Sequence, residues 1–451
     1  MKVVVTGGAG QLGTAILRRL ARERGVQQIV SLDVRPPIVA AGKVSHVIAD
    51  VRDPSIEEHL RGADAVVHLA FIVTKLMGRD DFETINVGGS KNVFDRAYAA
   101  GVRRFVYASS VAAYGVVDRA DPVTEDTPRV RDASFAYAAC KYDVEAFLDE
   151  WEAERPDVRV ARMRPSVLMG PRIEHNLGIA LRYRTIPALP KPVPMVWDED
   201  VADAFALALV REAQGGFNLS CDEPLDGTGL ARAGRLRLVP LPDGAVRTTM
   251  ALSDFLADQG IGVDPAWVRA ITKELTPYDT RRARDVLGWR PSCPTGESVI
   301  RRFVETDPGT MDPRLRLFFR MVDFGAQRAR PVPELERTDA DAHLWLLGPG
   351  GGDVALHVRN GRIRVTFGAP RPPRSVAMIR TSHFMDMLAG RMDFSVAQAT
   401  GRLRVEGDAT AAFLVGGMVA QLAEQRASAP GLAGKAVSLF SRFLSREDEG
   451  A

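Results

Sequence analysis

The stretch that decides the fold of the first half of this chain is Met1-Lys2-Val3-Val4-Val5-Thr6-Gly7-Gly8-Ala9-Gly10-Gln11-Leu12-Gly13. Apolar residues then recur at helix spacing, at Leu12, Ile16, Leu17 and Leu20. Glycine lets the backbone turn tightly and approach an anion closely, and the first N–H groups of a helix stabilise negative charge. Asp33 ends the next apolar run, where its carboxylate can accept hydrogen bonds from a ribose. These features together predict a strand, turn and helix that bind a dinucleotide.

Length and composition indicate a multidomain globular protein. The chain has 451 residues, of which 46% are hydrophobic and 26% are charged, which favours two or three domains. Its 59 basic and 57 acidic residues give a net charge of +2, which does not indicate a nucleic-acid partner. Three cysteines lie far apart without metal-ligand spacing, so we expect a cytoplasmic protein without a metal site. The first strand begins at residue 2 and no apolar run reaches membrane length, so we expect neither a signal peptide nor a transmembrane segment.

The first 305 residues have the pattern of a dinucleotide-binding domain. Strand-like runs alternate with helical stretches up to residue 165, which predicts a Rossmann-type, doubly wound parallel sheet of the α/β class. Residues 172–305 are expected to form a small substrate lobe. The predicted strands are 3–5, 28–32, 45–48, 65–69, 105–108 and 158–161, and two of the helices are 82–99 and 136–151.

The rest of the chain has a different pattern. Residues 306–340 are rich in Asp, Arg and Pro, and we interpret them as a linker. Residues 341–428 predict a separate α+β domain, with strands near 344–346, 354–358 and 362–365 and helices near 382–389 and 409–424. The tail, residues 429–451, is basic and apolar at helical spacing over 435–446. A membrane-surface helix, a docking helix and a frayed end all remain alternatives for it.

A tyrosine and a lysine four residues apart, Tyr137 and Lys141, share one face of the second predicted helix. A neighbouring ammonium stabilises phenolate, so we expect a lowered pKa for Tyr137 and a role in proton transfer. Ser110 follows a strand at its carboxyl end, where ligands bind in open parallel sheets, so it can donate a hydrogen bond to a substrate oxygen. Ser109 is the structural alternative, and we expect its side chain to bond to the backbone.

These residues together resemble the extended short-chain dehydrogenase/reductases, the NAD-dependent epimerase/dehydratase family. The resemblance implies that Tyr137 is the acid/base, that Lys141 holds the nicotinamide ribose and that Ser110 orients the substrate oxygen. It implies that the glycine-rich turn binds the pyrophosphate and that NAD, with NADP as the alternative, is the cofactor. The cofactor-binding residues that it implies are Gly7, Gly8, Gly10, Gln11, Leu12, Gly13, Asp33, Asp50, Val51, Leu69, Ala70, Asn86, Tyr137 and Lys141. Other matching pieces are His68, Asn86-Val87-Gly88-Gly89, Arg164-Pro165, Asp200-Val201-Ala202 and Leu287-Gly288-Trp289.

One departure from the family pattern bears on the substrate. Many nucleotide-sugar members carry asparagine where this chain has Val167, and an apolar side chain cannot bond a diphosphate. This favours a non-nucleotide substrate, as in the members similar to 3β-hydroxysteroid dehydrogenases. Asn176 resembles a substrate-phosphate contact of the sugar enzymes, but a loop residue or helix cap is the better interpretation. Asp33 favours NAD over NADP, although Arg35 could pair with a 2′-phosphate.

Two further groups have structural interpretations. His68 is expected to be a core histidine whose ring nitrogens are hydrogen-bonded, and the acids Asp198, Glu199 and Asp200 are expected to be favoured by a helix dipole.

The C-terminal domain resembles the sterol carrier protein type 2-like (SCP-2) domain, through residues 401–408 and the following helix, and through 382–390. An apolar stripe on that helix, Phe413, Leu414, Met418 and Leu422, would serve either the core or a lipid tunnel.

The sequence thus predicts an NAD(P)-dependent oxidoreductase that acts on a hydroxyl or ketone of a sterol- or lipid-like molecule, with a fused lipid-binding domain. We expect a homodimer, with peripheral membrane contact through the tail as an option. A nucleotide-sugar epimerase or dehydratase is the alternative. A non-catalytic, cofactor-sensing binding protein is a third hypothesis, and Ser110, Tyr137 and Lys141 argue against it.

Overall fold

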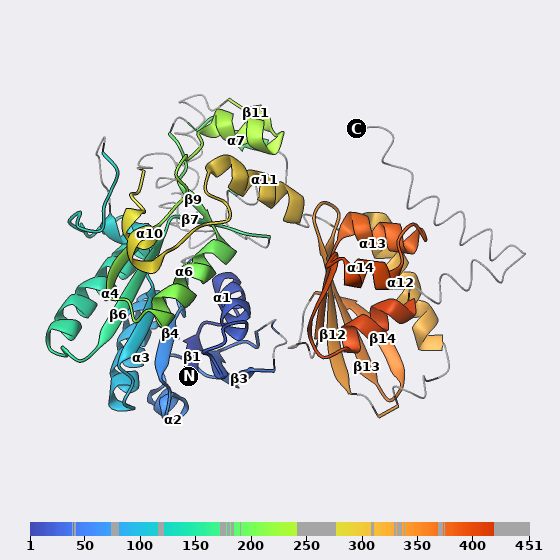
Figure 1. Cartoon of the computed structure of the whole chain (residues 1–451), viewed down its shortest axis with the longest axis horizontal. Helices are drawn as coiled ribbons and strands as arrows, with labels where there is room; N and C mark the ends of the chain where they lie inside the picture. The colour runs from blue at the N-terminus through green and yellow to red at the C-terminus, as the bar shows by residue number, and fades with distance from the viewer. Residues whose placement is uncertain are drawn as a thin grey trace, which may run out of the picture. The chain divides into compact units, whose positions relative to one another are not determined.

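The structure is a computed structural model that describes most of the chain. The described residues are all except 38, 40–41, 74–80, 116–120, 172–176, 178–180, 182–184, 190, 241–276, 308–310, 329–330, 332–335, 338, 369–372, 374 and 419–451. Two compact units are present (Figure 1). The first holds Met1–Pro37 and Lys43–Phe303, and the second begins at Val304. No helix in these described ranges is long and apolar enough to cross a membrane.

A parallel sheet of seven strands forms the centre of the first unit, in the order β10-β6-β5-β4-β1-β2-β3. The chain moves outward from β1 to β3 on one side and from β4 onward on the other, so the switch point lies between β1 and β4. Ligands of open α/β sheets bind at the carboxyl ends of such strands. The strands are β1 (Lys2–Thr6), β2 (Gln28–Asp33), β3 (Val44–Ile48), β4 (Ala65–His68), β5 (Arg104–Ala108), β6 (Arg159–Pro165) and β10 (Gly215–Leu219).

Helices cover both faces of this sheet, because its central strands are largely apolar and are buried on both sides. Helices α1 (Gln11–Ala21) and α6 (Asp198–Val210) pack together (Figure 1). A hydrophobic core of the first unit contains residues of four further helical elements: η1 (Pro54–Ile56), α2 (Glu57–Leu60), α3 (Gly89–Ala99) and α4 (Ala136–Ala153). In this core Phe94 and Trp151 are in edge-to-face contact. The helix predicted over 82–99 contains a π-helical turn at Thr84–Gly88, labelled η2. A 3-10 turn, η3 (Val111–Tyr114), follows β5.

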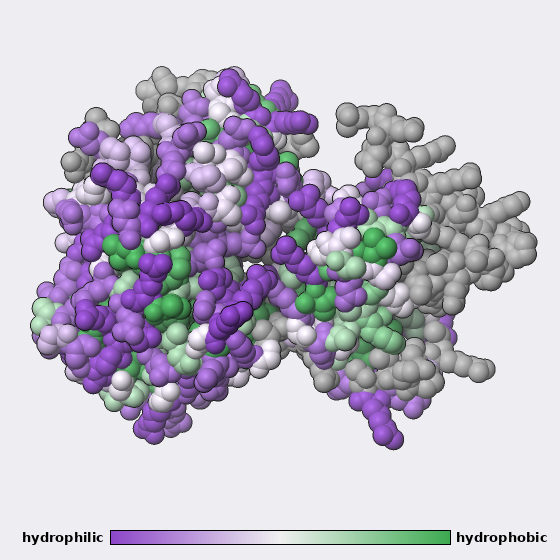
Figure 2. Space-filling model, viewed as in Figure 1, coloured by the Kyte–Doolittle hydropathy of each residue, from purple (hydrophilic) through white to green (hydrophobic). Residues whose placement is uncertain are grey.

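Short elements build the lobe that follows β6. Two pairs of strands are parallel, β7 with β9 and β8 with β11. The elements are β7 (Val167–Met169), β8 (Thr185–Pro187), β9 (Met195–Trp197), α7 (Gly227–Gly234), β11 (Arg237–Val239), α10 (Arg281–Leu287) and α11 (Gly296–Thr306). Polar side chains cover most of the face of the first unit that Figure 2 shows.

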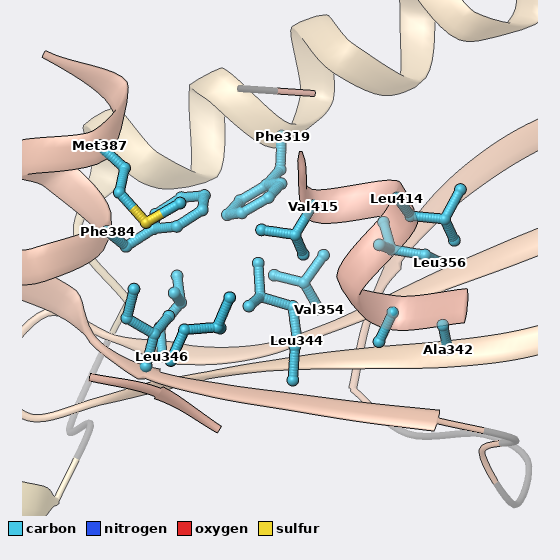
Figure 3. Packing of buried hydrophobic residues seen from close by; sticks show 14 of the residues in the cluster. Phe319, Ala342, Leu344, Leu346, Val354, Leu356, Phe384, Met387, Leu414 and Val415 are labelled. Atoms are coloured by element: carbon cyan, nitrogen blue, oxygen red, sulfur yellow. The ribbon is translucent and has the colours of Figure 1, made fainter. Parts of the chain in front are cut away.

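The second unit has a mixed sheet in the order β14-β13-β12-β15-β16, in which only the β12–β15 pair is parallel. The elements are α12 (Pro313–Arg328), β12 (Ala340–Leu347), β13 (Gly352–Arg359), β14 (Arg362–Phe367), β15 (Ser375–Arg380), α13 (Thr381–Leu388), α14 (Phe394–Ala399) and β16 (Leu403–Gly407), with residues 410–418 also helical. Helices pack over one face of the sheet and enclose an apolar core (Figure 3). The α+β class predicted for this part of the chain is therefore confirmed.

Two predictions for this unit are wrong. The linker proposed over 306–340 contains α12, because Leu315, Phe318 and Phe319 form an apolar face that is buried in the core. Phe413 does not belong to the buried stripe, since its side chain is 55% exposed whereas Leu414 is buried. Leu422, the tail over 435–446 and Asn176 lie outside the described residues.

Candidate active site

The glycine-rich turn between β1 and α1 has the shape of a pyrophosphate cradle. Gly7 has a φ of +75°, and a Cβ there would lie 2.5 Å from the Ala70 backbone nitrogen. A Cβ on Gly13 would lie 2.3 Å from the Gly7 carbonyl oxygen, so the third glycine lets helix and turn pack closely. At Gly10 the nearest atom to a Cβ is 3.4 Å away, so this side of the turn is open. The turn therefore fits a dinucleotide, with Gln11, Leu12 and Gly13 at the start of α1.

Asp33 lies beside this turn at the carboxyl end of β2. Its Oδ2 accepts a hydrogen bond from the Ala9 backbone at 2.9 Å, and its Oδ1 accepts one from the Arg35 backbone at 3.0 Å. The carboxylate is thereby fixed next to the cradle, where a ribose would lie. The Arg35 side chain is exposed.

The segments that follow β3 and β4 hold the other predicted cofactor residues, at the same edge of the sheet. Leu69 and Ala70 are held by Thr6, through its carbonyl oxygen at 3.1 Å and its hydroxyl at 3.4 Å. Asn86 is buried, and its amide bonds both the N–H and the carbonyl of Ile72, at 2.7 and 3.0 Å. Asn86 thus fixes the segment that follows β4 from within the π-helical turn.

Asp50 and Val51 follow β3. The Asp50 carboxylate pairs with Arg52, which lowers the pKa of Asp50. Val51 is buried against Gly89, where a Cβ would lie 2.7 Å from a Val51 methyl group. Whether these two residues border an adenine stays a prediction.

The structure brings Ser110, Tyr137 and Lys141 together at the carboxyl end of β5. The Ser110 side chain is hydrogen-bonded to Tyr137 and also caps η3, where it accepts from the Ala112 N–H at 3.1 Å. Lys141 is buried on α4, and its Nζ donates to the Ala108 carbonyl oxygen at 2.6 Å. The predicted grouping of the three side chains is therefore present.

Aromatic rings enclose Tyr137. Phe71 contacts its ring edge-on at 5.7 Å between centroids, and Phe135 lies 5.8 Å away. The Lys141 Nζ lies over the Phe71 ring, 3.4 Å from its centroid, and 5.8 Å from the centroid of Tyr137. Phe71 and Phe135 were not among the predicted site residues, although each stands close in the sequence to a residue that was.

This arrangement corrects the expected pKa of Tyr137. Burial raises the pKa of Tyr137 to about 12, and the hydrogen bond with Ser110 only partly opposes this effect. The expectation that Lys141 lowers the pKa of Tyr137 is therefore wrong for this geometry. Burial also holds the pKa of Lys141 well below its ordinary value.

The structural interpretation of His68 agrees with the geometry, whereas the backbone partner expected for the Ser109 side chain is wrong. The Ser109 hydroxyl donates to Glu145 Oε1 at 2.5 Å. Both ring nitrogens of His68 are hydrogen-bonded, to Thr6 at 2.7 Å and to Ser90 at 2.9 Å, and burial lowers its pKa to about 3. His68 is therefore a neutral core residue.

Two of the acids at the start of α6 make contacts beyond their favourable interaction with the helix dipole. Asp200 accepts from the backbones of Ser292 and Cys293, so it fixes a loop. Asp198 is 5% exposed, and its Oδ2 lies 3.4 Å from the Gln11 amide nitrogen. Burial, with a contribution from neighbouring Glu199, raises the pKa of Asp198 to about 7. In the described ranges no group of three or more His, Cys, Asp or Glu residues is placed to hold a metal ion.

Residues 3–189 match the family described as "NAD dependent epimerase/dehydratase family". Residues 3–189 form an epimerase/dehydratase domain. The chain is accordingly an enzyme of the oxidoreductase or epimerase type, and its cofactor class is NAD(P), which the cradle and Asp33 fit.

Similar proteins include several dehydrogenases and reductases. A 2-alkyl-3-oxoalkanoate reductase of Stenotrophomonas maltophilia is 32% identical over 38% of this chain and 52% of its own length. A protein called y4nG of Sinorhizobium fredii is 29% identical over 66% of this chain and 77% of its own. A solved UDP-glucose 4-epimerase has 17% identity and a TM-score of 0.53, and the match covers 67% of this chain and 96% of that one. This last likeness shows the fold alone.

Proposed function

We propose that the chain is an NAD-dependent oxidoreductase that acts on a hydroxyl or ketone of a hydrophobic, sterol- or lipid-like molecule. The observation that carries this proposal is the apolar enclosure of Tyr137 by Phe71, Phe135, Ala112 and Ala138. An apolar ring system gains free energy by burial beside such side chains, whereas a sugar hydroxyl there would lose hydrogen bonds with water. Val167, which follows β6 closely, adds no polar group that could bond a diphosphate.

The chain's own residues supply the proton chemistry. Ser110 would hold the substrate oxygen, and Tyr137 beside it would give that oxygen a proton. With its pKa raised by burial, Tyr137 is protonated at neutral pH, as a proton donor to a ketone oxygen must be. Bound NADH supplies the hydride. Lys141 would hold the nicotinamide ribose, and Asp33 the adenosine ribose.

Turnover with a defined substrate panel tests the function. The enzyme is incubated with NADH and cyclic or long-chain ketones, with NAD and the matching alcohols, and with UDP-glucose or UDP-glucuronic acid. We expect oxidation of NADH with hydrophobic ketones or reduction of NAD with the matching alcohols, and no turnover of the UDP-sugars. Turnover of a UDP-sugar with no activity on any hydrophobic ketone would instead support the nucleotide-sugar alternative. A relative named 2-alkyl-3-oxoalkanoate reductase supports the inclusion of 3-oxoacids in the panel.

We predict tighter binding of NAD(H) than of NADP(H). The Asp33 carboxylate would accept hydrogen bonds from ribose hydroxyls and repel a 2′-phosphate. Dissociation constants measured by calorimetry should favour NAD by about tenfold or more, and Asp33→Ser should reduce this preference. Arg35→Ser is the matched control, because its side chain is exposed and its removal should leave NAD binding unchanged. Tighter NADP(H) binding by the wild-type protein would contradict this assignment.

We also propose that the second unit, which contains residues 341–428 and α12, is an SCP-2-like lipid-binding domain. The support is the resemblance over 401–408 and a core bordered by adaptable methionines, among them Met385, Met387 and Met392. A domain that binds lipid next to a reductase raises the local concentration of a poorly soluble substrate.

We predict saturable binding of a fluorescent fatty acid, cis-parinaric acid, by the full-length chain. Binding should raise the melting temperature of the second unit, because the ligand stabilises the folded state. Tyr137→Phe should bind the fatty acid equally well, which separates this site from the active site. No binding by the full-length chain would mean that the core side chains fill the domain (Figure 3).

A further inference from the structure

A carboxylate that the proposed chemistry does not use, Glu145, lies directly behind the active site. Tyr137, Lys141 and Glu145 follow one another at four-residue steps on α4, so they share one face of the helix. The Glu145 side chain is 0% exposed. It accepts the hydrogen bond from Ser109 at 2.5 Å, and Ser109 is the residue directly before Ser110.

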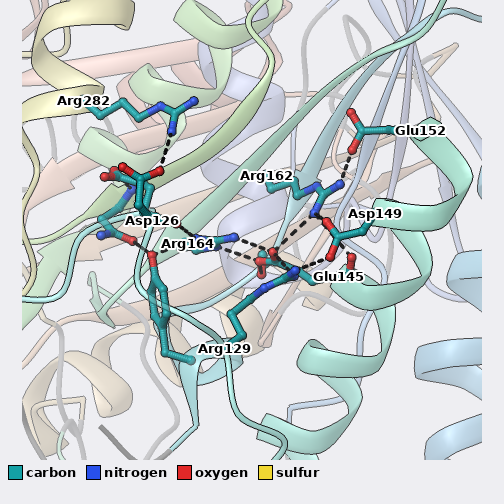
Figure 4. A network of polar contacts seen from close by, with 12 residues as sticks. Asp126, Arg129, Glu145, Asp149, Glu152, Arg162, Arg164 and Arg282 are labelled. Carbon is teal, nitrogen blue, oxygen red and sulfur yellow. Dashed lines mark hydrogen bonds and ion pairs between the residues drawn. The ribbon is translucent and has the colours of Figure 1, made fainter. Parts of the chain in front are cut away.

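Arginines from two other segments keep Glu145 ionised (Figure 4). Arg164 on β6 contacts both carboxylate oxygens, at 2.8 and 2.5 Å, and Arg129 donates to one of them at 2.6 Å. Burial alone would raise the pKa of Glu145, but these guanidinium groups, with Arg162 farther away at 3.7 Å, lower it to about 2. Glu145 is therefore a fixed negative charge at every pH at which an enzyme is assayed.

The same charge acts on Lys141. Burial lowers the pKa of Lys141, and Glu145 is the largest influence that opposes this effect. The other titratable groups near the ammonium are neutral at pH 7. They are His68 on β4, Tyr107 on β5 with its hydroxyl 3.5 Å from Nζ, and Tyr137 and Cys140 on α4. Glu145 thus supplies the negative charge that balances the buried ammonium.

We propose that Glu145 is a positioning residue of the active site, which holds Ser110 in place through Ser109 and keeps Lys141 charged. This inference rests on the proposed function, because Ser110 and Lys141 are assigned there. It gives the buried ion network a role beyond stability: one carboxylate supports both the substrate side and the cofactor side of the site.

The outer part of the same network provides a control. Glu152 pairs with Arg162 at the far end of α4 and does not contact Ser109 or Lys141. Glu145→Gln and Glu152→Gln therefore remove one charge each from the same network, but only the first removes it from the active site. Ser109→Ala removes the link to Ser110 and leaves the charge on Lys141.

The variants are compared by kcat, by KM and by the dissociation constant of NAD between pH 6 and pH 10. For Glu145→Gln we expect kcat to fall about tenfold. NAD binding should weaken at a pH about one unit lower than in the wild type, since the ammonium then loses its proton earlier. Ser109→Ala should lower kcat without moving the pH dependence of NAD binding. Glu152→Gln should match the wild type in both.

An unchanged kcat and an unchanged pH dependence in Glu145→Gln would overturn the proposal, as would equal losses in Glu152→Gln. If Glu145→Gln does not fold, Ser109→Ala decides, and a wild-type kcat in that variant overturns the proposal. The NAD measurements need no turnover. A wild-type enzyme that is inactive on every ketone would therefore count against the proposed function, while the pH dependence still tests Glu145.

Discussion

Replacing Tyr137 with phenylalanine should lower kcat by about 100- to 10,000-fold while NAD binding stays near that of the wild type. The phenylalanine ring keeps the contacts with Phe71 and Phe135, so the enclosure of the site persists. The variant lacks only the hydroxyl that bonds Ser110 and would pass a proton to the substrate oxygen. Steady-state kinetics on a verified ketone and calorimetry with NAD measure the two quantities separately.

A matched control for this variant lies on the same helix. Tyr142 follows Lys141 directly and therefore faces away from the side that Tyr137 and Lys141 share. Tyr142→Phe should keep the wild-type kcat. A wild-type kcat in Tyr137→Phe would show that another group transfers the proton. Loss of NAD binding in that variant would show that its hydroxyl serves cofactor binding instead.

Local sequence was sufficient to predict the cofactor cradle. Gly7, Gly10 and Gly13 lie within one strand–turn–helix unit, where a Cβ at Gly7 or Gly13 would clash with nearby backbone and Gly10 leaves one side of the turn open. The apolar runs predicted the strands up to β6 because a parallel strand buried on both faces is continuously apolar. Strand β10 was not predicted, because Gly215-Gly216-Phe217-Asn218-Leu219 carries two glycines and a buried asparagine whose hydrogen bonds come from distant loops.

The catalytic residues could be predicted from their spacing, but their ionisation could not. Tyr137 and Lys141 are neighbours on any helix. The pKa of Tyr137 depends on Phe71 and Phe135, and the direction of the Lys141 ammonium depends on the Ala108 carbonyl. These contacts arise from packing between separate elements. The sequence pattern therefore did not indicate that, for the pKa of Tyr137, burial outweighs the effect of the Lys141 charge.

Two features that were not predicted, Glu145 and α12, could have been predicted from helical spacing in the sequence. Glu145 stands four residues after Lys141, the same step that pointed to Tyr137. In α12, Leu315, Phe318, Phe319 and Val322 follow helical spacing. The surrounding Asp, Arg and Pro residues led to the interpretation of a linker, although charged residues on one face are normal for a helix that covers a sheet.

Replacing Arg164 with methionine should lower the free energy of unfolding of the first unit by about 3–5 kcal/mol. Arg164 has a side chain that is 5% exposed, and it bonds both oxygens of Glu145 and the Tyr114 hydroxyl, the latter at 2.7 Å. Its loss leaves a buried carboxylate with less compensating charge, and methionine fills the space without a donor. Urea-dependent hydrogen exchange of α4 peptides measures the change. Arg131→Met is the control, because its pair with Asp143 is partly exposed and should contribute less than about 1 kcal/mol.

The pH dependence of the stability lost in Arg164→Met distinguishes the contribution of charge from the contribution of packing. The pKa of Glu145 is about 2 in the folded protein and lies below its unfolded value. Its ion pairs therefore stabilise the fold above the unfolded pKa, near about 4.3, and this contribution is lost as the pH falls toward 2. In Arg164→Met the folded pKa of Glu145 moves up toward the unfolded value, so less of this pH-dependent stability exists. The difference between wild type and variant should be constant near pH 7 and should shrink below about pH 4. An equal difference at pH 3 and pH 7 would mean that Arg164 stabilises the fold by packing, and that Glu145 does not depend on it for its charge.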